Sequence, residues 1–537
     1  MTAKTSVADV ILNVMETYGI ETMFSIPGIH TVEFYRTLEG RAIRHVTPRH
    51  EQGAAFMAYG YGFATGRPAC VMLITGPGLL NAATGLAEAY SDSVPVLAIA
   101  ANNLVSEIGV GRGALHETQD QTVVGAQVAG FTHALLDPAN TEEVMHRAIS
   151  HLTVARPRPA LIDVPRDILA RPAPYENRPR INAATPSPNA AALVEAVALL
   201  NTAKNPLIIA GGGARHAAKD IRALADAFNI PVVTTNSGKG ILPEDHPLCL
   251  GSTLPFAPTQ AKVKAADVVL ALGTELGETD LLYTCVPYEI SGKLIRVDID
   301  PAQLTMNYHP AVAILGDAGD AVRGLLSHLD REPIEGTRDS VKATLDTAHG
   351  GWSKGSAAHK AVLDILADTL DADAVICADS TQIAYTGNHY FPSKAAGCWL
   401  FPNGYGTLGS AMPAALGAKL GCPNRQVLAI VGDGSLLYTI EELACAVENK
   451  LGVPILLWNN HAYGEIRDAM KADNIPTVGV DLYTPDFQTI AKGFGCKATK
   501  IRDLDALAPA LTEAFGADVP TLIEIDITED GIGSIGG

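Results

Sequence analysis

Positive charge is scarce in this sequence, and the long apolar runs of membrane proteins are missing. The chain has 39 Lys and Arg against 58 Asp and Glu, a formal net charge of -19, and no basic run offsets it. That balance argues against a nucleic-acid-binding protein. No apolar stretch reaches the ~18 residues of a membrane span, and the N-terminus, MTAKTSVADVILNVMETYGI, turns amphipathic at once. We therefore expect neither a membrane segment nor a signal peptide.

Paired cysteines are also missing. The eight Cys show no CxxC pair and no spacing typical of metal ligands, so we expect free thiols in a cytoplasmic protein. The apolar fraction of 47% and the charged fraction of 18% are typical of a globular chain with ample core. With 537 residues, the chain has room for about three domains of ordinary size.

Strand-like and helix-like patterns alternate through three stretches of the chain. This alternation is typical of α/β folds, and it predicts three Rossmann-like parallel-sheet domains at residues 1–170, 190–330 and 355–537. A linker rich in Pro, Ala and Asn separates the first two domains, and a polar connection from about 331 to 354 separates the last two.

The most informative stretch lies between residues 427 and 464. Two apolar runs, Val427 to Val431 and Val453 to Trp458, read as buried strands, and Thr439 to Lys450 has helical spacing. The two strands are therefore parallel, and their ends lie side by side. Asp433 and Asn460 follow these ends and should converge.

Oxygen atoms at this point suit a hard divalent cation. The carboxylate of Asp433, the amide oxygen of Asn460 and the carbonyl of Ala462 are the ligands expected for Mg²⁺, which shares its other positions with phosphate and water. Gly434 lets a diphosphate approach the main chain, and Ser435 begins a helix whose amides favour anions.

A second candidate lies in the first domain. The strand Ile43 to Val46 leads to Glu51, which stands at a helix start just beyond a strand end, where open α/β sheets bind ligands. A glutamate at a helix N-terminus is also favourable for dipole reasons alone, so the residue by itself leaves a structural role open.

Several motifs together carry a family resemblance. GDG and NN are separated by 24 residues, and RHEQGAAFMAYGYGFATG, TGPGLLNA and IDVPRD precede them. This combination resembles the thiamine diphosphate decarboxylase and acetolactate synthase family. The resemblance implies thiamine diphosphate and Mg²⁺ as cofactors, and it makes the three domains pyrimidine-binding, central and diphosphate-binding.

The resemblance also implies roles for individual residues. Glu51 would bond the pyrimidine ring and promote the tautomer that removes the thiazolium C2 proton. Leu408 would bend the cofactor, with a core position as the alternative, and the carbonyl of Gly406 would accept a bond from the cofactor's amino group. The further cofactor-binding candidates near the diphosphate are Thr381, Gln382, Tyr463 and Gly464.

In this family the two ends of the cofactor are held by different subunits. Glu51 of one chain would then face Asp433 and Asn460 of its partner, so a homodimer is the smallest complete unit and a dimer of dimers is the usual extension.

The central domain gives no clear ligand motif. The Gly211-Gly212-Gly213 turn lacks the GxGxxG spacing, so a tight turn without ligand is expected. Acetolactate synthases bind FAD in this domain, but residues 272–277 lack the basic and aromatic residues expected for it, so FAD is not expected here.

The substrate pocket departs from acetolactate synthase. His116 stands where those enzymes carry glutamine, and His30 replaces a small residue; each would protonate the reaction intermediate or bind the substrate carboxylate, unless it is a surface histidine. Glu465 would pair with a guanidinium tail. Glu117 and Asp120 are further candidates, with plain surface charge as the alternative.

These departures decide the expected function. SIPGIHTVEFYR, GALHETQDQ and ADSTQ make the chain most similar to 5-guanidino-2-oxopentanoate decarboxylases. We expect non-oxidative decarboxylation of a small-molecule 2-oxo acid, with an acetolactate synthase-like carboligase as the alternative. A homologue without turnover and a nicotinamide or flavin oxidoreductase are the other hypotheses.

Overall fold

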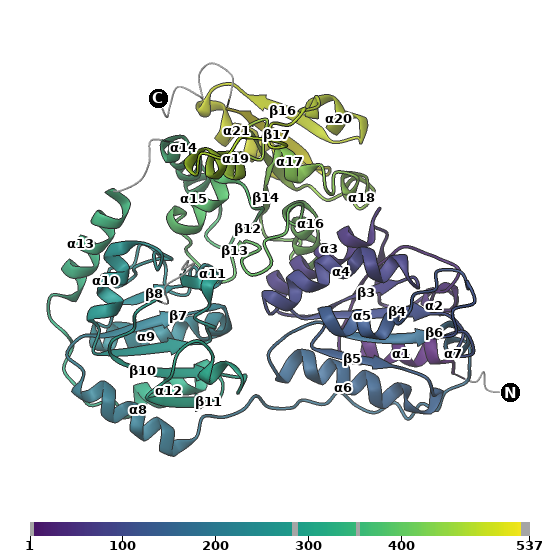
Figure 1. The fold of residues 1–537 in the computed structure, drawn as a ribbon, viewed down its shortest axis with the longest axis horizontal. Helices are drawn as coiled ribbons and strands as arrows, with labels where there is room; N and C mark the ends of the chain where they lie inside the picture. Colours follow the sequence, from purple (N-terminus) through teal and green to yellow (C-terminus); the bar gives the residue numbers. More distant parts are fainter. Residues whose placement is uncertain (1–4, 282–287, 351–354, 528–537) are drawn as a thin grey trace.

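Three wholly parallel sheets form the framework of the protein. The structure, a computed structural model, describes residues 5–281, 288–350 and 355–527. The sheet orders are β2-β1-β3-β4-β6-β5, β11-β10-β9-β7-β8 and β13-β12-β14-β15-β17-β16. Each sheet lies in one unit, and Figure 1 shows the first and central units side by side with the third above them. The predicted fold class is confirmed.

The elements follow one another as strand and helix in each unit. The first unit contains α1 Val7–Thr17, β1 Thr22–Ser25, α2 Val32–Leu38, β2 Arg44–Val46, α3 Glu51–Thr65, β3 Ala69–Leu73, α4 Pro77–Ser91, β4 Val96–Asn102, α5 Gln121–Val128, β5 Phe131–Ala134, α6 Thr141–Val154, β6 Ala160–Pro165 and α7 Arg166–Leu169. The central unit and the helix after it contain α8 Ala190–Thr202, β7 Pro206–Ala210, α9 Ala218–Phe228, β8 Val232–Thr234, α10 Ala257–Ala265, β9 Val268–Leu272, α11 Glu278–Leu281, β10 Lys293–Asp298, β11 Val312–Leu315, α12 Ala318–His328 and α13 Thr337–Gly350. The third unit contains α14 Gly355–Thr369, β12 Val375–Ala378, α15 Gln382–Tyr390, β13 Trp399–Leu400, α16 Ala411–Gly421, β14 Val427–Gly432, α17 Asp433–Leu436, α18 Glu442–Glu448, β15 Pro454–Asn459, α19 Gly464–Ala472, α20 Phe487–Gly493, β16 Lys497–Ile501, α21 Leu507–Phe515 and β17 Thr521–Asp526.

The inner strands are buried on both faces, as β4 and β14 show with every residue buried. Helices cover both faces of such sheets, so strand residues read as apolar runs and polar residues gather in the loops at the strand ends. The carboxyl ends of the strands therefore carry the residues available for binding.

The first and third units share one topology. Numbered within each unit, both sheets run in the order 2-1-3-4-6-5, and the central sheet has the five-stranded order 2-1-3-4-5. Equivalent strand ends in the outer units can therefore be compared directly.

The two outer units meet through α3 and α16, which follow the second strand of each sheet. A Cβ atom at Gly60 would lie 1.9 Å from the carbonyl oxygen of Ala414, and one at Gly417 would lie 1.8 Å from that of Met57. The helices therefore touch through their main chains, a contact that only glycine permits. Apolar residues of both units form one continuous core across this joint.

One predicted element differs from the structure. The helix expected from Thr439 to Lys450 is shortened to α18, Glu442 to Glu448, and a turn lies between it and the preceding α17. The hydroxyl of Thr439 donates a hydrogen bond to the carbonyl oxygen of Gly409 at 2.8 Å, which fixes the turn against another loop. Apolar periodicity does not register such a contact.

Two expectations about composition can be compared with the structure. The seven cysteines in the described residues are free thiols. Within residues 5–281, 288–350 and 355–527, none of the helices has the length and apolar character needed to cross a bilayer.

Candidate active site

Asp433 and Asn460 lie at the same edge of the third sheet. β14 and β15 are adjacent and parallel, and Gly432 pairs with Trp458 in the register. Burial raises the pKa of the Asp433 carboxyl, while main-chain amides, including those of Gly434 and Asn460, lower it. The strand, helix, strand reasoning from the sequence thus describes the geometry found here.

The two consecutive asparagines face different partners. Asn459 donates to Glu524 of β17 at 2.9 Å and is used within the sheet. Asn460 donates to the amide oxygen of Gln382 at 3.0 Å, and its own amide oxygen accepts from the Ala462 amide at 3.1 Å. Only the second asparagine therefore points toward the predicted diphosphate site.

The residues at this edge fit a hard cation. Among the described residues there is no group of three or more His, Cys, Asp and Glu that would hold a metal. The predicted set contains only one such side chain, Asp433, together with an amide oxygen and the Ala462 carbonyl. Asp433 is only 3% exposed, so water solvates its carboxylate poorly. A bound divalent ion would balance the negative charge of that carboxylate.

Glycines bring the main chain close together around these residues. A Cβ at Gly434 would lie 2.7 Å from the ring of Tyr463, and one at Gly464 would lie 2.4 Å from the amide nitrogen of Asn460. A Cβ at Gly432 would lie 3.1 Å from the Thr381 hydroxyl. The side chain of Ser435 bonds back to Gly432 and closes the turn. The glycines therefore let the turn after β14 pack closely against Thr381 and Tyr463, and let α19 begin against Asn460.

The segment from Gly406 to Leu408 lies beside the same edge. Gly406 has a positive φ of 69°, and Leu408 is half-buried and belongs to none of the apolar clusters. Buried Asp379 fixes the end of the segment by accepting from the Gly409 amide at 2.9 Å. Burial raises the pKa of Asp379 to about 6. The sequence placed Asp379 at a strand end but gave no sign of this contact.

Glu51 lies at the start of α3, where His50 caps the helix by accepting from the Gln52 amide at 3.1 Å. Its carboxylate accepts a hydrogen bond from the side chain of Asn81 at 2.9 Å. Asn81 was not predicted as a site residue, although it lies in the TGPGLLNA motif, the only sequence feature that would have pointed to it.

His30 and His116 form a pair. Their ring centroids lie 5.3 Å apart at 75°, an edge-to-face arrangement. Neither ring nitrogen of His30, nor Nδ1 of His116, has a hydrogen-bond partner in the part of the chain that the structure describes. Burial and the charges of Arg166 and His116 lower the pKa of His30, so its ring is neutral at pH 7. Two separate predictions from sequence thus become one feature.

Glu117 and Asp120 are already engaged by their own loop. Glu117 accepts from the amides of Gly111, Gly113 and Ala114 at 2.9, 2.7 and 3.0 Å. Asp120 caps α5 through the Val123 amide at 3.0 Å. Both side chains therefore stabilise the local main chain, and we assign neither of them to substrate recognition.

Glu465 stands on α19, and Gln382 lies between it and Asn460. Partial desolvation and the charge of Asp468 raise the pKa of Glu465, while a hydrogen bond from Gln382 lowers it. Gln382 also donates to Asp468 at 3.1 Å. Two carboxylates thus share one amide donor, and the sequence analysis did not identify Asp468.

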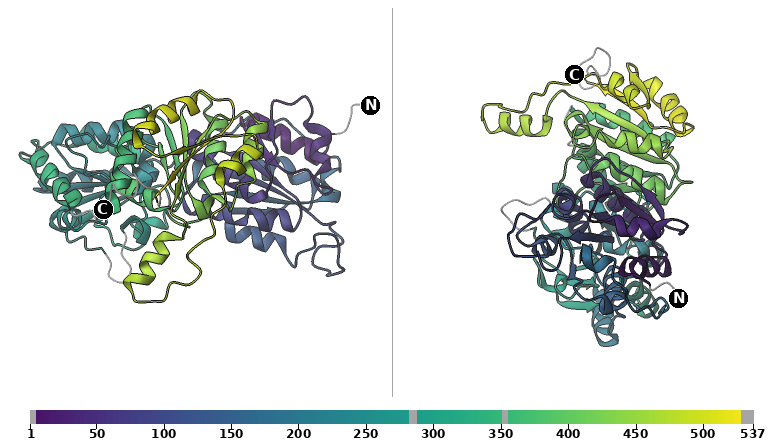
Figure 2. Two further views of the ribbon diagram at one scale, coloured as in Figure 1. Left: turned by 90° about the horizontal axis from the view of Figure 1, so that it is seen from above. Right: turned by 90° about the vertical axis from the view of Figure 1, so that its right-hand side faces the viewer.

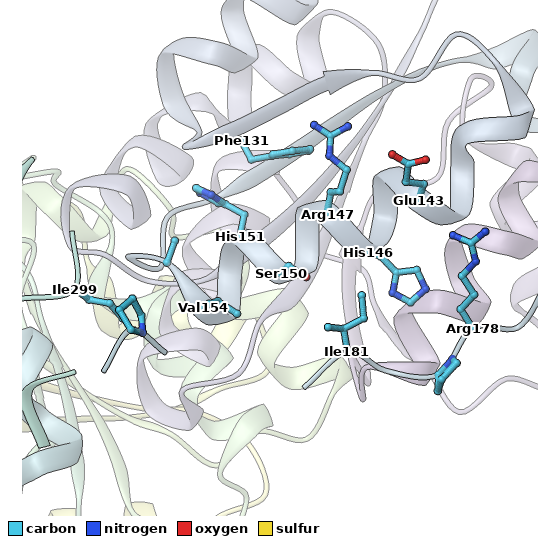
Figure 3. A pocket seen from close by; sticks show the side chains of 13 residues that line it. Phe131, Glu143, His146, Arg147, Ser150, His151, Val154, Arg178, Ile181 and Ile299 are labelled. Carbon is cyan, nitrogen blue, oxygen red and sulfur yellow. The ribbon is translucent and has the colours of Figure 1, made fainter. Parts of the chain in front are cut away.

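Two cavities lie away from these residues. The larger, of about 850 Å³, is bounded by α6 and the linker after it, and Figure 3 shows His146, Arg147, His151, Phe131 and Ile181 around it. The second, of about 720 Å³, lies where the central unit meets the other two. Neither is lined by a predicted catalytic, cofactor or metal residue.

The glycine-rich turn of the central unit borders the second cavity. A Cβ at Gly211 would lie 2.3 Å from the carbonyl oxygen of Gly273. The glycines therefore allow two strand-end loops to touch. Where a tight turn was expected from the sequence, Gly212–Ala217 form a short 3-10 helix that begins after Gly211.

Three models of one family match most of the chain. "Thiamine pyrophosphate enzyme, N-terminal TPP binding domain" matches residues 5–124, and the central-domain model matches residues 193–325. "Thiamine pyrophosphate enzyme, C-terminal TPP binding domain" matches residues 379–525.

Curated relatives span nearly the full length. The chain is 43% identical, over 96% of its length and 93% of the relative, to a probable 2-ketoarginine decarboxylase, AruI, of Pseudomonas aeruginosa. It is 31% identical, over 97% and 93%, to the large subunit of acetolactate synthase isozyme 1 of Escherichia coli. It is 30% identical, over 97% and 88%, to an acetolactate synthase of Mycobacterium bovis.

Proposed function

The chain belongs to the thiamine pyrophosphate enzyme family, and from this premise we propose that it is a thiamine diphosphate- and Mg²⁺-dependent decarboxylase whose substrate is 5-guanidino-2-oxopentanoate (2-ketoarginine). The observation that supports the chemistry is the convergence of Asp433 and Asn460 at one sheet edge. The substrate assignment rests on Glu465 beside that edge and on the likeness to the 2-ketoarginine decarboxylase.

Each residue has a defined task in this proposal. Asp433, Asn460 and the Ala462 carbonyl hold Mg²⁺, and the further residues around the diphosphate are Thr381, Gln382, Gly434, Ser435, Tyr463 and Gly464. Glu51, which accepts a hydrogen bond from Asn81, would hold the pyrimidine ring, and the Gly406 to Leu408 segment would contact the cofactor from the third unit. The bound cofactor supplies the electron sink for the carbanion formed when carbon dioxide leaves.

In this proposal, carboxylates bind the guanidinium end of the substrate and histidines lie at its reacting end. Glu465, together with Asp468, pairs with the guanidinium, which binds carboxylates through two parallel hydrogen bonds. The His30 and His116 pair faces the reacting end, where imidazole nitrogens that have no partner among the described residues, both of His30 and Nδ1 of His116, are able to exchange a proton with substrate.

A site shared by two subunits is supported by exposed apolar side chains. They gather after the strand ends of the first unit, at Ile29, Val32, Leu80, Val105, Ile108, Val110, Leu115 and Val123. A second group follows the strand ends of the third unit, at Tyr405, Leu437, Tyr438, Ile466, Ile475, Val478 and Tyr483. Figure 2 shows α19 and the segment after it projecting from the body. Large exposed apolar surfaces mark interaction sites, so we infer a homodimer that covers both groups, with a dimer of dimers as its extension.

The remaining assignments complete the proposal. Residues 1–170, 190–330 and 355–537 act as the pyrimidine-binding, central and diphosphate-binding domains, and the free thiols agree with a cytoplasmic enzyme. The central domain holds no FAD. A colourless purified protein, judged by its visible absorption spectrum, is the expected result, whereas flavin absorption would favour an oxidoreductase.

The experiment that tests the function is a screen of 2-oxo acids. Carbon dioxide release should be fastest with 5-guanidino-2-oxopentanoate, slower with aliphatic acids, and abolished when Mg²⁺ is chelated. Pyruvate given alone distinguishes the alternative, because a carboligase would form acetolactate. Acetolactate as the main product, or absence of turnover with every acid despite bound cofactor, would overturn the proposal.

A further inference from the structure

A buried carboxylate of the third unit crosses the joint into the first unit. Glu442, at the start of α18, has no exposed surface. Its Oε1 accepts hydrogen bonds from the amides of Arg49 and His50, both at 2.9 Å, and its Oε2 lies 3.1 Å from the Arg49 amide. A Cβ at Gly53 would lie 2.2 Å from Oε1, so the glycine there makes room for this contact.

A second buried carboxylate crosses the joint in the opposite direction. Glu88 of α4 in the first unit also has no exposed surface. Its Oε2 accepts from both the amide and the hydroxyl of Thr407, at 3.2 and 2.6 Å. Nearby, Asp92 accepts from the Gly404 amide at 3.3 Å, which fixes the start of the same segment.

The two contacts occupy equivalent places in the shared topology. Each carboxylate belongs to the helical connection after the third strand of its own unit. Each contacts the main chain after the second strand of the other unit, at Arg49 and His50 after β2 and at Thr407 after β13. The next residues along the chain are Glu51 and Leu408, the two residues proposed to set the cofactor's tautomer and its bend.

Packing alone does not explain these groups. Desolvation raises the pKa of Glu442 to about 8 and also raises the pKa of Glu88. Burying an ionisable group is unfavourable, and an apolar side chain of similar size would fill a joint more cheaply. The main-chain amides just before a helix have no hydrogen-bond partner within that helix. A carboxyl group accepts hydrogen bonds from such amides and so fixes their position.

We propose that Glu442 and Glu88 are reciprocal positioning residues, each holding the main chain that carries a cofactor-facing residue of the opposite unit. Glu442 sets the place of Glu51, and Glu88 sets the place of Leu408. Neither is assigned a contact with cofactor or substrate. The inference rests on the proposed function for what Glu51 and Leu408 do. The hydrogen bonds that fix the two main-chain segments, however, are present in the protein without cofactor.

The first test measures, without cofactor, how firmly Glu442 fixes the main chain before α3. Hydrogen–deuterium exchange of residues 47–53 should be about tenfold faster in Glu442→Ala than in wild type, with distant segments unchanged. Glu442→Gln keeps the accepting oxygen and should restore protection. Glu448→Gln is the matched control, because exposed Glu448 pairs with the side chain of Arg49 and not with its amide. Unchanged exchange at residues 47–53, or equal acceleration throughout the chain, would overturn the inference.

The second test measures the consequence for the cofactor. With thiamine diphosphate and Mg²⁺ bound, exchange of the cofactor's C2 proton should slow about 10- to 100-fold in Glu442→Ala, as expected for a misplaced catalytic group, and recover in Glu442→Gln. Cofactor affinity should stay within about twofold, since the diphosphate residues are untouched. A purely structural role would instead weaken affinity and stability together without rescue by glutamine.

The reciprocal variants keep the inference testable if one protein fails to fold. Glu88→Ala should accelerate exchange at residues 404–408 and leave residues 47–53 protected, the converse of Glu442→Ala. Glu442→Asp, which shortens the side chain by one methylene, replaces Glu442→Ala if that variant is insoluble. Wild-type protein that does not accelerate C2 exchange would refute the proposed function, whereas fast wild-type exchange with unchanged variants would refute only the positioning roles.

Discussion

The first and third units have the same strand order but different chemistry at equivalent strand ends. After the third strand, one has Thr75-Gly76-Pro77-Gly78 and the other has Asp433-Gly434-Ser435. After the fourth strand both carry two asparagines, Asn102-Asn103 and Asn459-Asn460. The first of each pair bonds an acid of the sixth strand, Asp163 or Glu524, at 2.9 Å. The scaffold is therefore conserved between the two halves down to individual hydrogen bonds.

The second asparagine of each pair shows where the halves diverge. Asn103 donates to the carbonyl oxygen of Leu115 at 2.8 Å and so holds the loop that carries His116. Asn460 reaches Gln382 beside buried Asp433. In the proposed function, one half supports the proton-handling side chains and the other half gathers the oxygen ligands. The comparison teaches that a single strand arrangement can place different chemistry at equivalent strand ends through its loops alone.

The largest expected effect concerns the proton-handling half. Glu51→Gln should reduce turnover about 10²- to 10⁴-fold, because an amide does not share a proton with the pyrimidine nitrogen. Cofactor affinity, measured by titration calorimetry, should stay near that of wild type. A variant with full turnover would remove Glu51 from its role, and one that loses the cofactor would assign anchoring to the first unit.

The oxygen-ligand half should show the opposite pattern. Asn460→Ala should weaken binding of Mg²⁺ and cofactor by about 10- to 100-fold, a loss comparable to that of other metal-site partners. Asn103→Ala, the equivalent change in the first unit, should leave that affinity unchanged. An equal loss of Mg²⁺ affinity in both variants would contradict the assignment of the metal ligands to the third unit.

A smaller effect on substrate preference should distinguish Glu465 of the third unit from Glu117 of the first unit. Glu465→Gln should lower kcat/KM for 5-guanidino-2-oxopentanoate about tenfold more than for pyruvate, because only the cationic acid loses an ion pair. Glu117→Gln, which weakens the loop that Glu117 stabilises, should lower kcat/KM for both substrates alike. Equal losses with Glu465→Gln would exclude it from recognition of the substrate.

The smallest effect is a dependence of stability on pH. Burial, helped by the negative charge of Glu441, raises the pKa of Glu442 from 4.5 to about 8, although the amides of Arg49 and His50 and the charge of Arg49 lower it. The folded protein therefore holds this proton more tightly than the unfolded chain, and its contribution to stability is lost as pH rises from about 4.5 to about 8. Glu442→Gln should flatten that part of the curve in thermal melts. An identical slope in both proteins would contradict the assigned pKa.

Sequence reasoning identified the fold class and the converging groups because both depend on local patterns. Apolar runs and their polar ends place Asp433 and Asn460 beside each other once the strands are known to be parallel. The contacts that orient these groups were missed, because Asn81, Asp379 and Glu442 act on residues 30 to 393 positions away. No spacing rule reports which distant amide a buried carboxylate will accept from.

The glycine contacts between α3 and α16 have one more consequence. Helices that touch through bare main chain at Gly60 and Gly417 have no side chains between them to slide or repack. The outer units of one chain therefore form one rigid body at this joint, and any movement that opens a site between them has to come from the loops and not from a hinge between α3 and α16.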